Sequence, residues 1–291
     1  MSTPRAAGRY RGDLLLFMAL AFTVSWASWF TAIGLGGSAM APPAVVPYLL
    51  GAFGPLVAAL VVRVRRGLRG EPVPEHAVRF RWQALLWAPL LLVLASATVL
   101  GPAFLAQVAG GPAVSPESAL DVVANAGGPA AFLVSMVISG PLSEEPGWRG
   151  TAYPRLRASM GRFQIGLVLG VIWAVWHLPL FFINGTVQNQ LGLDSPSGVL
   201  FAVSNIPMTM LTCYAYERGG VLASIAVHFS VNTTMVLLGV HAPVTQALII
   251  GVQSIVVVLL LVTSRPQAGS DAMPMARSQA KNLGGQEEFA R

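Results

Sequence analysis

Residues 130–150 read AAFLVSMVISGPLSEEPGWRG, an apolar run that ends in two adjacent carboxylates, Glu144 and Glu145. A carboxylate in or near hydrocarbon costs a few kcal/mol even on the most lenient insertion scale. Two adjacent carboxylates also repel each other, so a cation or a proton is expected to accompany them. The stretch therefore predicts a helix that enters a membrane and carries a polar site.

The composition of the whole chain agrees with this interpretation. Of the 291 residues, 54% are hydrophobic and only 10% are charged, and the mean hydropathy is +0.65. A soluble domain would carry about 25% charged residues, so the chain is predicted to be a polytopic membrane protein. The lone cysteine, Cys213, excludes an intrachain disulfide and a cysteine-based metal cluster.

Eight apolar segments are long enough to cross a bilayer, which takes about 20 residues. They are residues 14–35, 44–62, 83–108, 128–148, 163–184, 197–216, 220–239 and 242–263. The first run exceeds the ~7–15-residue core of a signal peptide, so we expect it to be retained as a helix. The predicted fold is an all-α bundle of about eight transmembrane helices.

The basic residues set the predicted orientation. With the N-terminus inside, residues 1–13, the connections 63–82 and 149–162, Arg218 and the C-terminal tail lie in the cytoplasm and hold every Lys and Arg. Both termini are therefore predicted to be cytoplasmic, in a multi-pass protein of a cell membrane. The scarcity of lysine favours a bacterial cytoplasmic membrane. The sequence pI of about 10.2 follows from this topology, so we expect no nucleic-acid partner.

The domain organisation is expected to be simple. Residues 1–265 are predicted to form one polytopic membrane domain, and the polar residues 266–291 a disordered cytoplasmic tail.

Several polar residues that are costly to bury in a membrane recur at helical spacing in the later apolar segments. Glu145 and Arg149 are four residues apart, so they share a helix face and can form an ion pair. The alternative is an interfacial ion pair that simply faces the cytoplasm. Pro146 would disrupt a helix here unless neighbouring groups or water satisfy the freed backbone groups.

Two histidines follow the same four-residue spacing. Trp173 and His177 share a face, with Trp176 beside them, and His228 and Asn232 present an imidazole and an amide together. Each pair alone is more often packing or hydrogen bonding between helices. Counted at about 1.5 Å per residue, however, both histidines and Glu144 can meet in one layer of the cytoplasmic half of the membrane.

The ordered motifs resemble the CPBP family, which comprises the CAAX prenyl proteases and their bacterial relatives, also called Abi-type membrane proteins. The motifs are Glu-Glu-x-x-x-Arg, aromatic-x-x-x-His and His-x-x-x-Asn, and they cover about residues 140–235. Their matches here are Glu144, Glu145, Arg149, Trp173, His177, His228 and Asn232. Trp173 stands where the family often has Phe, and the aromatic wall is preserved.

The resemblance implies an intramembrane endopeptidase, glutamate-dependent or metal-dependent, that cleaves a membrane protein or peptide near the surface of the lipid bilayer. Glu144 would activate a water molecule that His177 helps to hold, while His228 and Asn232 donate to the oxyanion. Glu145 and Arg149 would set the local field. The aromatic residues expected to contact substrate are Trp173 and Trp176.

Two questions stay open at the level of sequence. Glu144, His177 and His228 are a suitable zinc ligand set, but zinc would use Glu144 as a ligand and leave only Glu145 as base. The sequence therefore favours a reaction without a required cofactor, with zinc as the alternative. The competing functions are a proton-coupled transporter that uses the same buried residues and a non-enzymatic immunity or partner-binding protein.

Overall fold

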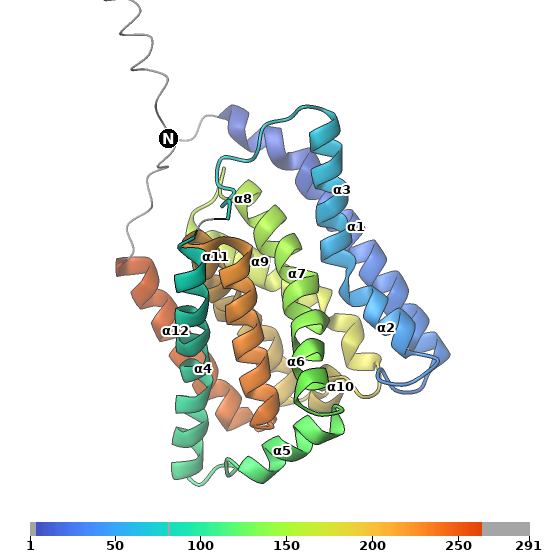
Figure 1. The fold of residues 1–291 in the computed structure, drawn as a ribbon, viewed down its shortest axis with the longest axis vertical. Helices are drawn as coiled ribbons and strands as arrows, with labels where there is room; N and C mark the ends of the chain where they lie inside the picture. The colour runs from blue at the N-terminus through green and yellow to red at the C-terminus, as the bar shows by residue number, and fades with distance from the viewer. Residues whose placement is uncertain (1–3, 81, 264–291) are drawn as a thin grey trace, which may run out of the picture.

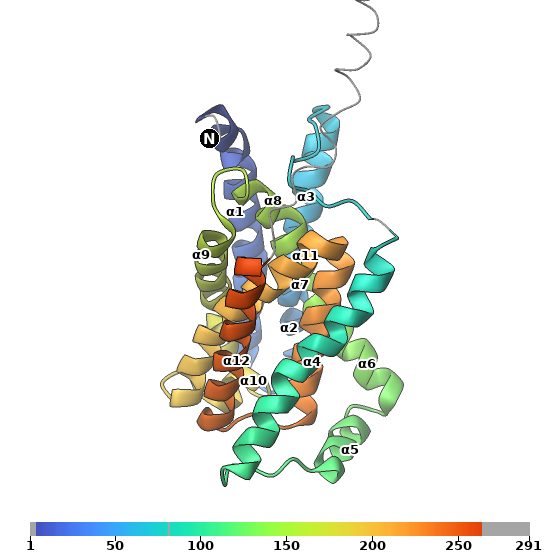
Figure 2. The same cartoon turned by 90° about the vertical axis from the view of Figure 1, so that its left-hand side faces the viewer.

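The structure, a computed structural model, describes residues 4–80 and 82–263. Within these ranges the chain is helical, and an isolated β-bridge joins Ser38 to Asn184. The helices are α1 Pro4–Leu35, α2 Val45–Ala52, α3 Gly54–Leu68, α4 Ala84–Val108, α5 Pro116–Asn125, α6 Pro129–Val137, η1 Ile138–Leu142, α7 Ser143–Gly147, η2 Trp148–Ala152, α8 Tyr153–Leu156, α9 Arg162–Trp176, η3 Leu178–Phe182, α10 Val187–Leu191, α11 Pro196–Leu237 and α12 Pro243–Thr263. Figures 1 and 2 show the long helices as a bundle, with α5 across its lower end.

Five of the described helices are long and apolar enough to cross a membrane, and the number rises to seven if each of two bent pairs is one span. The first pair, α2 and α3, bends by 46°, and the second, α5 with Pro129–Leu156, bends by 81°. Large apolar side chains on the outer faces of the bundle are exposed, such as Val93 at 63% and Ile255 at 62%. This pattern suits contact with lipid and confirms the predicted all-α fold of membrane-spanning helices.

The predicted sixth and seventh spans are the two halves of α11, which is counted as one helix in that total. They meet at Gly219 and Gly220, whose backbone is not helical, and Gly220 has a φ of 66° that favours glycine. A Cβ on Gly219 would lie 3.3 Å from the Cα of Ala84, so the break also lets α4 approach α11 closely. The chain therefore reverses direction with almost no loop.

Several predicted boundaries and two predicted loops differ from the structure, and α1 and α3 extend beyond the predicted spans 14–35 and 44–62. The span expected at 163–184 leaves α-helical geometry at His177, because Pro179 cannot continue an α-helix, and η3 follows. The helix expected at 128–148 continues through η2 and α8 to Leu156. The connections expected at 109–127 and 185–196 contain α5, capped by Ser115, and the short α10.

Acidic residues organise the end of the bundle that holds the basic connections, which we call the basic end. It comprises the end of α3, the α3–α4 connection, α8, the start of α9 and the break in α11 (Figure 1). Buried Asp13 of α1 binds Arg66 at 2.7 Å and Arg155 at 3.1 Å. Glu217 of α11 binds Arg162 at 2.8 Å. These ion pairs join elements that are far apart in the chain. They were not predicted, because the arginines in the sequence indicated only the orientation of the protein in the membrane.

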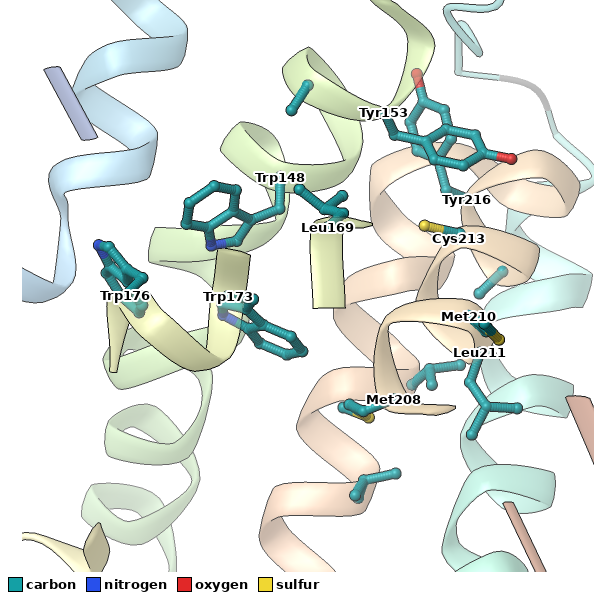
Figure 3. Packing of buried hydrophobic residues seen from close by; sticks show 14 of the residues in the cluster. Trp148, Tyr153, Leu169, Trp173, Trp176, Met208, Met210, Leu211, Cys213 and Tyr216 are labelled. Carbon is teal, nitrogen blue, oxygen red and sulfur yellow. The ribbon is translucent and has the colours of Figure 1, made fainter. Parts of the chain in front are cut away.

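A cluster of aromatic side chains fixes the middle of the bundle against α1. Trp176 of α9 lies 4.7 Å from Trp29 and 5.8 Å from Trp148, measured between ring centroids. Phe17 packs edge-on against Trp148 at 5.4 Å. Figure 3 shows Trp148, Trp173 and Trp176 at this junction. The helix that carries the adjacent glutamates is thereby held between α1 and α9.

The predicted tail, residues 266–291, lies outside the described residues.

Candidate functional site

The two glutamates lie on a helix whose geometry is set by two prolines. Pro141 and Pro146 have no N–H and cannot complete the α-helical hydrogen-bond ladder. The chain widens into the π-helical turns η1 and η2 on either side of α7, which holds both glutamates. Thr151 donates to the Pro146 carbonyl oxygen at 3.0 Å. Because η1, α7, η2 and α8 follow one another without a gap, the helix is continuous through Pro146. Turns of this π-helical kind are frequent at functional sites.

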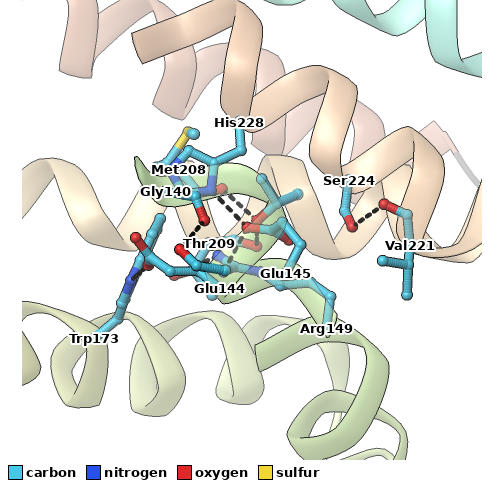
Figure 4. Close-up of polar contacts among 12 residues, drawn as sticks. Gly140, Glu144, Glu145, Arg149, Trp173, Met208, Thr209, Val221, Ser224 and His228 are labelled. Carbon is cyan, nitrogen blue, oxygen red and sulfur yellow. Dashed lines mark hydrogen bonds and ion pairs between the residues drawn. The ribbon is translucent and has the colours of Figure 1, made fainter. Parts of the chain in front are cut away.

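Glu145 is the centre of a buried chain of charges. Its Oε1 accepts a hydrogen bond from Arg149 Nη1 at 3.0 Å and lies 2.8 Å from His228 Nδ1. Glu145 and Arg149 are both 0% exposed, which confirms the predicted i,i+4 ion pair and contradicts the alternative of a pair that faces the cytoplasm. The hydrogen bond between Glu145 and His228 was not predicted. It fixes the ring of His228 so that Nε2 points away from Glu145 (Figure 4).

Glu144 is held by a different partner. Trp173 Nε1 donates to its Oε2 at 2.6 Å, and the Trp173 ring lies 4.4 Å from the guanidinium carbon of Arg149. A cation on the face of an indole is attracted by the ring quadrupole. Trp173 therefore orients Glu144 and covers Arg149, in addition to forming the predicted aromatic wall. The Oε1 of Glu144 has no hydrogen bond to another described residue (Figure 4).

His177 lies one turn beyond Trp173, at the end of α9. Its Nδ1 is 2.8 Å from the carbonyl oxygen of Trp173, so Nδ1 carries the proton and Nε2 is the acceptor. The ring packs against Trp176 and Phe201, at 4.9 Å and 5.4 Å between centroids. Trp176 is almost fully buried and contributes more to packing than to an open surface.

The polar atoms converge beside Gly140. The point where a Cβ would lie on Gly140 is 3.5 Å from Glu144 Oε1, 3.5 Å from His228 Nε2 and 3.6 Å from Asn232 Nδ2. It opens into a cavity of about 160 Å³ that His177 also lines. A carboxylate, an imidazole and an amide therefore surround one space that a small polar molecule can occupy.

Other residues that line this cavity carried no signal in the sequence. Gly140 gives the space itself, and Tyr48 approaches from α2. Gln246 of α12 also lines the cavity and is 4% exposed, and its Oε1 has no hydrogen-bond partner among the described residues. An unpaired buried amide oxygen is costly, so it marks a place where a donor can bind. Gln246 was not predicted, because a lone glutamine in an apolar segment forms no motif.

The proposed metal ligands do not form a cluster. The described His, Cys, Asp and Glu residues include no group of three that could hold a metal ion. Glu144 Oε2 is bound to Trp173, and the third polar group beside Gly140 is the amide of Asn232, which is a poor zinc ligand. The three predicted ligands Glu144, His177 and His228 therefore do not fit a zinc centre as they lie.

Comparison with known proteins locates this site within a family. Residues 126–234 match the family described as type II CAAX prenyl endopeptidase, Rce1-like. This segment is therefore similar to Rce1-like endopeptidases. It contains Gly140 and all the predicted site residues, from Glu144 to Asn232. Tyr48 and Gln246 lie outside it, so residues beyond the matched segment complete the lining of the cavity.

A curated relative agrees with the family match. Over 100 residues the chain is 31% identical to CAAX prenyl protease 2 of Methanococcus maripaludis. The aligned stretch covers 33% of this chain and 37% of the relative, so the chain spans little more than a third of that protein's length. Together with the apolar helices, the Rce1-like segment makes this a multi-pass membrane protein.

Proposed function

We propose that the protein is an intramembrane endopeptidase in which Glu144 activates the attacking water. The convergence of Glu144 Oε1, His228 Nε2 and Asn232 Nδ2 on one point beside Gly140 carries this proposal. A general base and two hydrogen-bond donors around a single small space are what peptide hydrolysis needs. The Rce1-like match of the same segment supports the choice of peptide hydrolysis over other reactions.

The reaction follows from these positions. Glu144 takes a proton from the water, whose oxygen then attacks the carbonyl carbon of the substrate peptide. The carbonyl oxygen becomes an oxyanion that accepts hydrogen bonds from His228 Nε2 and Asn232 Nδ2. Glu144 afterwards gives its proton to the leaving amine, and the C–N bond breaks. The Nε2 of His177 accepts a hydrogen bond from the same water and helps to hold it.

The buried charges behind the cavity keep these groups in position. His228 Nε2 donates when the ring carries both protons, and the Glu145 carboxylate at Nδ1 balances that charge. Arg149 binds the same Glu145 oxygen and keeps it in place, and Trp173 holds the second oxygen of Glu144. Such preorganised donors cost little reorganisation when the reaction occurs.

The substrate class is a membrane-associated protein or peptide. The cavity is lined by Tyr48, Trp176 and Gln246 as well as by the reactive groups, so one segment of extended peptide can bind between apolar rings and an amide. We propose that the free oxygen of Gln246 accepts a hydrogen bond from a backbone N–H of the substrate. The related archaeal protein is named for prenylated CAAX substrates, which makes these peptides the first ones to test.

The deciding experiment uses purified protein in an uncharged detergent. Farnesylated and unmodified peptides that end in a CAAX sequence are incubated with it, and the products are identified by mass spectrometry. Cleavage in detergent, where no ion gradient exists, would exclude transport as the sole function. A Glu144→Ala variant should retain uncleaved membrane peptides from cell extracts. If neither peptide set is cleaved and the variant retains the same peptides as a Glu75→Ala control, the endopeptidase proposal fails.

A further inference from the structure

A second and larger cavity lies at the basic end, away from the polar atoms beside Gly140. Its volume is about 430 Å³, compared with about 160 Å³ for the first cavity. It is bounded by the end of α3, the connection to α4, η2, α8 and the break in α11. The charged and polar side chains that line it are Arg63, Arg66, Arg79, Arg155, Glu71 and Tyr216.

Two of these arginines already have partners. Arg66 and Arg155 are buried and share the carboxylate of Asp13, and Arg66 also binds Glu71 at 2.7 Å. Glu71 is the one carboxylate among the described residues that line the cavity, and it is therefore engaged. Among the described residues that line the cavity, no carboxylate is therefore left to bind a further cation.

The other two arginines give the cavity an excess of positive charge. Arg63 and Arg79 are exposed, and neither has an ion pair or hydrogen bond with another described side chain. A guanidinium group is charged at any physiological pH and presents a planar fork of donors that matches phosphate oxygens. A cavity with two such groups and no free acid favours an anion with several oxygens.

The backbone at Gly150 allows Arg63 to lie against the wall of the cavity. A Cβ on Gly150, in the π-turn η2, would lie 2.8 Å from Arg63 Nη2 and 3.0 Å from Val221 Cγ2. Gly150 thus makes room for Arg63 to lie against η2. On the opposite side, Tyr216 accepts a hydrogen bond from the backbone N–H of Val78 at 2.9 Å and fixes the α3–α4 connection beside Arg79. The cavity is therefore a formed feature of the fold.

We propose that this cavity binds a phosphate group, with Arg63 and Arg79 as its ligands. Its volume exceeds the ~30 Å³ share of one water molecule many times over, so the group can carry a substituent. The cavity lies at the ends of candidate spans, where basic residues attract anionic lipid headgroups. An anionic phospholipid headgroup is the favoured source of the phosphate, and a free phosphate or soluble phosphoester is the other. This site is independent of the proposed peptidase activity.

The test measures binding to protein purified and delipidated in an uncharged detergent. Short-chain phosphatidylglycerol and inorganic phosphate are titrated separately by calorimetry, and retained lipid is counted by native mass spectrometry. The wild-type protein should bind one phosphatidylglycerol, and Arg63→Gln combined with Arg79→Gln should weaken this affinity at least tenfold. The matched control is Arg69→Gln, which removes an exposed arginine at the end of α3 that does not line the cavity. It should change the affinity less than twofold.

The outcomes separate the sources and can overturn the proposal. Binding of lipid alone identifies a headgroup site, whereas binding of both ligands with the same sensitivity to the two arginines identifies a general phosphate site. An equal loss in the Arg69→Gln control would mean diffuse attraction to a basic surface and would refute a built site. Failure of both ligands to bind the wild type would refute it too. If the double variant does not fold, Arg63→Lys and Arg79→Lys keep the charge but lose the fork, and each should lower the affinity severalfold.

Discussion

The two cavities of this protein are built from charged groups in opposite ways. In the cavity beside Gly140, the charged groups of Glu145 and Arg149 are fully buried and form an ion pair with each other, and only selected atoms of the site reach the open space. In the cavity at the basic end, Arg63 and Arg79 face the open space without partners among the described side chains. Fixed geometry suits a reaction, whereas unpaired charge and room suit the binding of an ion. Substitutions in the first cavity can show whether this difference is functional.

The largest expected effect is on the general base. Glu144→Gln keeps the shape and the hydrogen bond from Trp173 but removes the carboxylate, so peptide cleavage should fall about 100-fold or more. The measurement is kcat with a cleaved peptide, alongside a thermal unfolding scan that should show a folded protein. Glu75→Gln, which removes an exposed carboxylate in the α3–α4 connection, is the matched control and should keep the wild-type rate. Normal turnover by Glu144→Gln would assign the base to another residue.

The next effect concerns the space rather than the charges. Gly140→Ala adds a Cβ to the point on which Glu144, His228 and Asn232 converge, so it should displace the attacking water. A misplacement of about 1 Å can cost about 100-fold in rate, and we expect a loss of at least tenfold. The fold should tolerate the change because the nearest atoms around the new methyl group are 3.5 Å away.

Two other helical glycines provide the control for that variant. A Cβ on Gly101 of α4 or Gly251 of α12 would meet no atom within 4 Å. Gly101→Ala and Gly251→Ala should therefore leave cleavage unchanged and stabilise their helices slightly. If Gly140→Ala were as active as these two variants, the converging point could not be the site of water attack.

Local patterns in the sequence predicted much of this site, and long-range contacts explain what was missed. The pairs Glu145–Arg149 and His228–Asn232 were predicted because helical periodicity needs only neighbouring residues. The hydrogen bond from His228 to Glu145 joins residues 83 positions apart, and no local pattern encodes it. Gly140 was missed because its contribution is the absence of a side chain.

The same distinction applies to the fold. Hydropathy located the apolar segments, and a pair of glycines divided α11 close to the predicted boundary. The arginines at the basic end were predicted to have a topological role only. Arg155 and Asp13 are 142 residues apart, so their buried ion pair depends on the packing of α8 against α1. The side of the membrane on which this end lies stays a prediction, which labelling of cysteine substitutions from outside can test.

A smaller effect is expected for the cation behind the site. Arg149→Lys keeps a positive charge near Glu145 but loses the hydrogen bond to Thr209 and the planar contact with Trp173. Loss of one buried hydrogen bond costs about 1–3 kcal/mol, so kcat should fall about tenfold. Because Arg149 acts through Glu145 and His228, KM should stay the same.

A double variant, compared with its two single variants, separates a positioning role of Arg149 from a contribution to stability alone. If Arg149 positions His228, adding Arg149→Lys to a His228→Gln variant should cost much less than tenfold, because the group it positions is already absent. An undiminished second loss would instead mean that Arg149 supports the fold in general. Thermal unfolding of each variant shows whether the proteins compared are equally folded.

The smallest effect is expected at Gln246, a residue of α12 that lines the same cavity. Gln246→Leu has a similar volume but removes the buried oxygen that has no partner among the described residues. If that oxygen accepts a hydrogen bond from the substrate backbone, the variant loses about 0.5–1.5 kcal/mol of binding, which raises KM about two- to tenfold. The fold should not be destabilised, because replacing an unsatisfied buried amide with an apolar side chain removes a desolvation cost.

Gln83→Leu, at the exposed start of α4, is the matched control and should leave KM unchanged. A Gln246→Leu variant that is more stable and binds substrate as well as the wild type would show that this oxygen has no role in recognition. A variant that is more stable but binds substrate more weakly would show that the amide is kept for the substrate at the expense of stability.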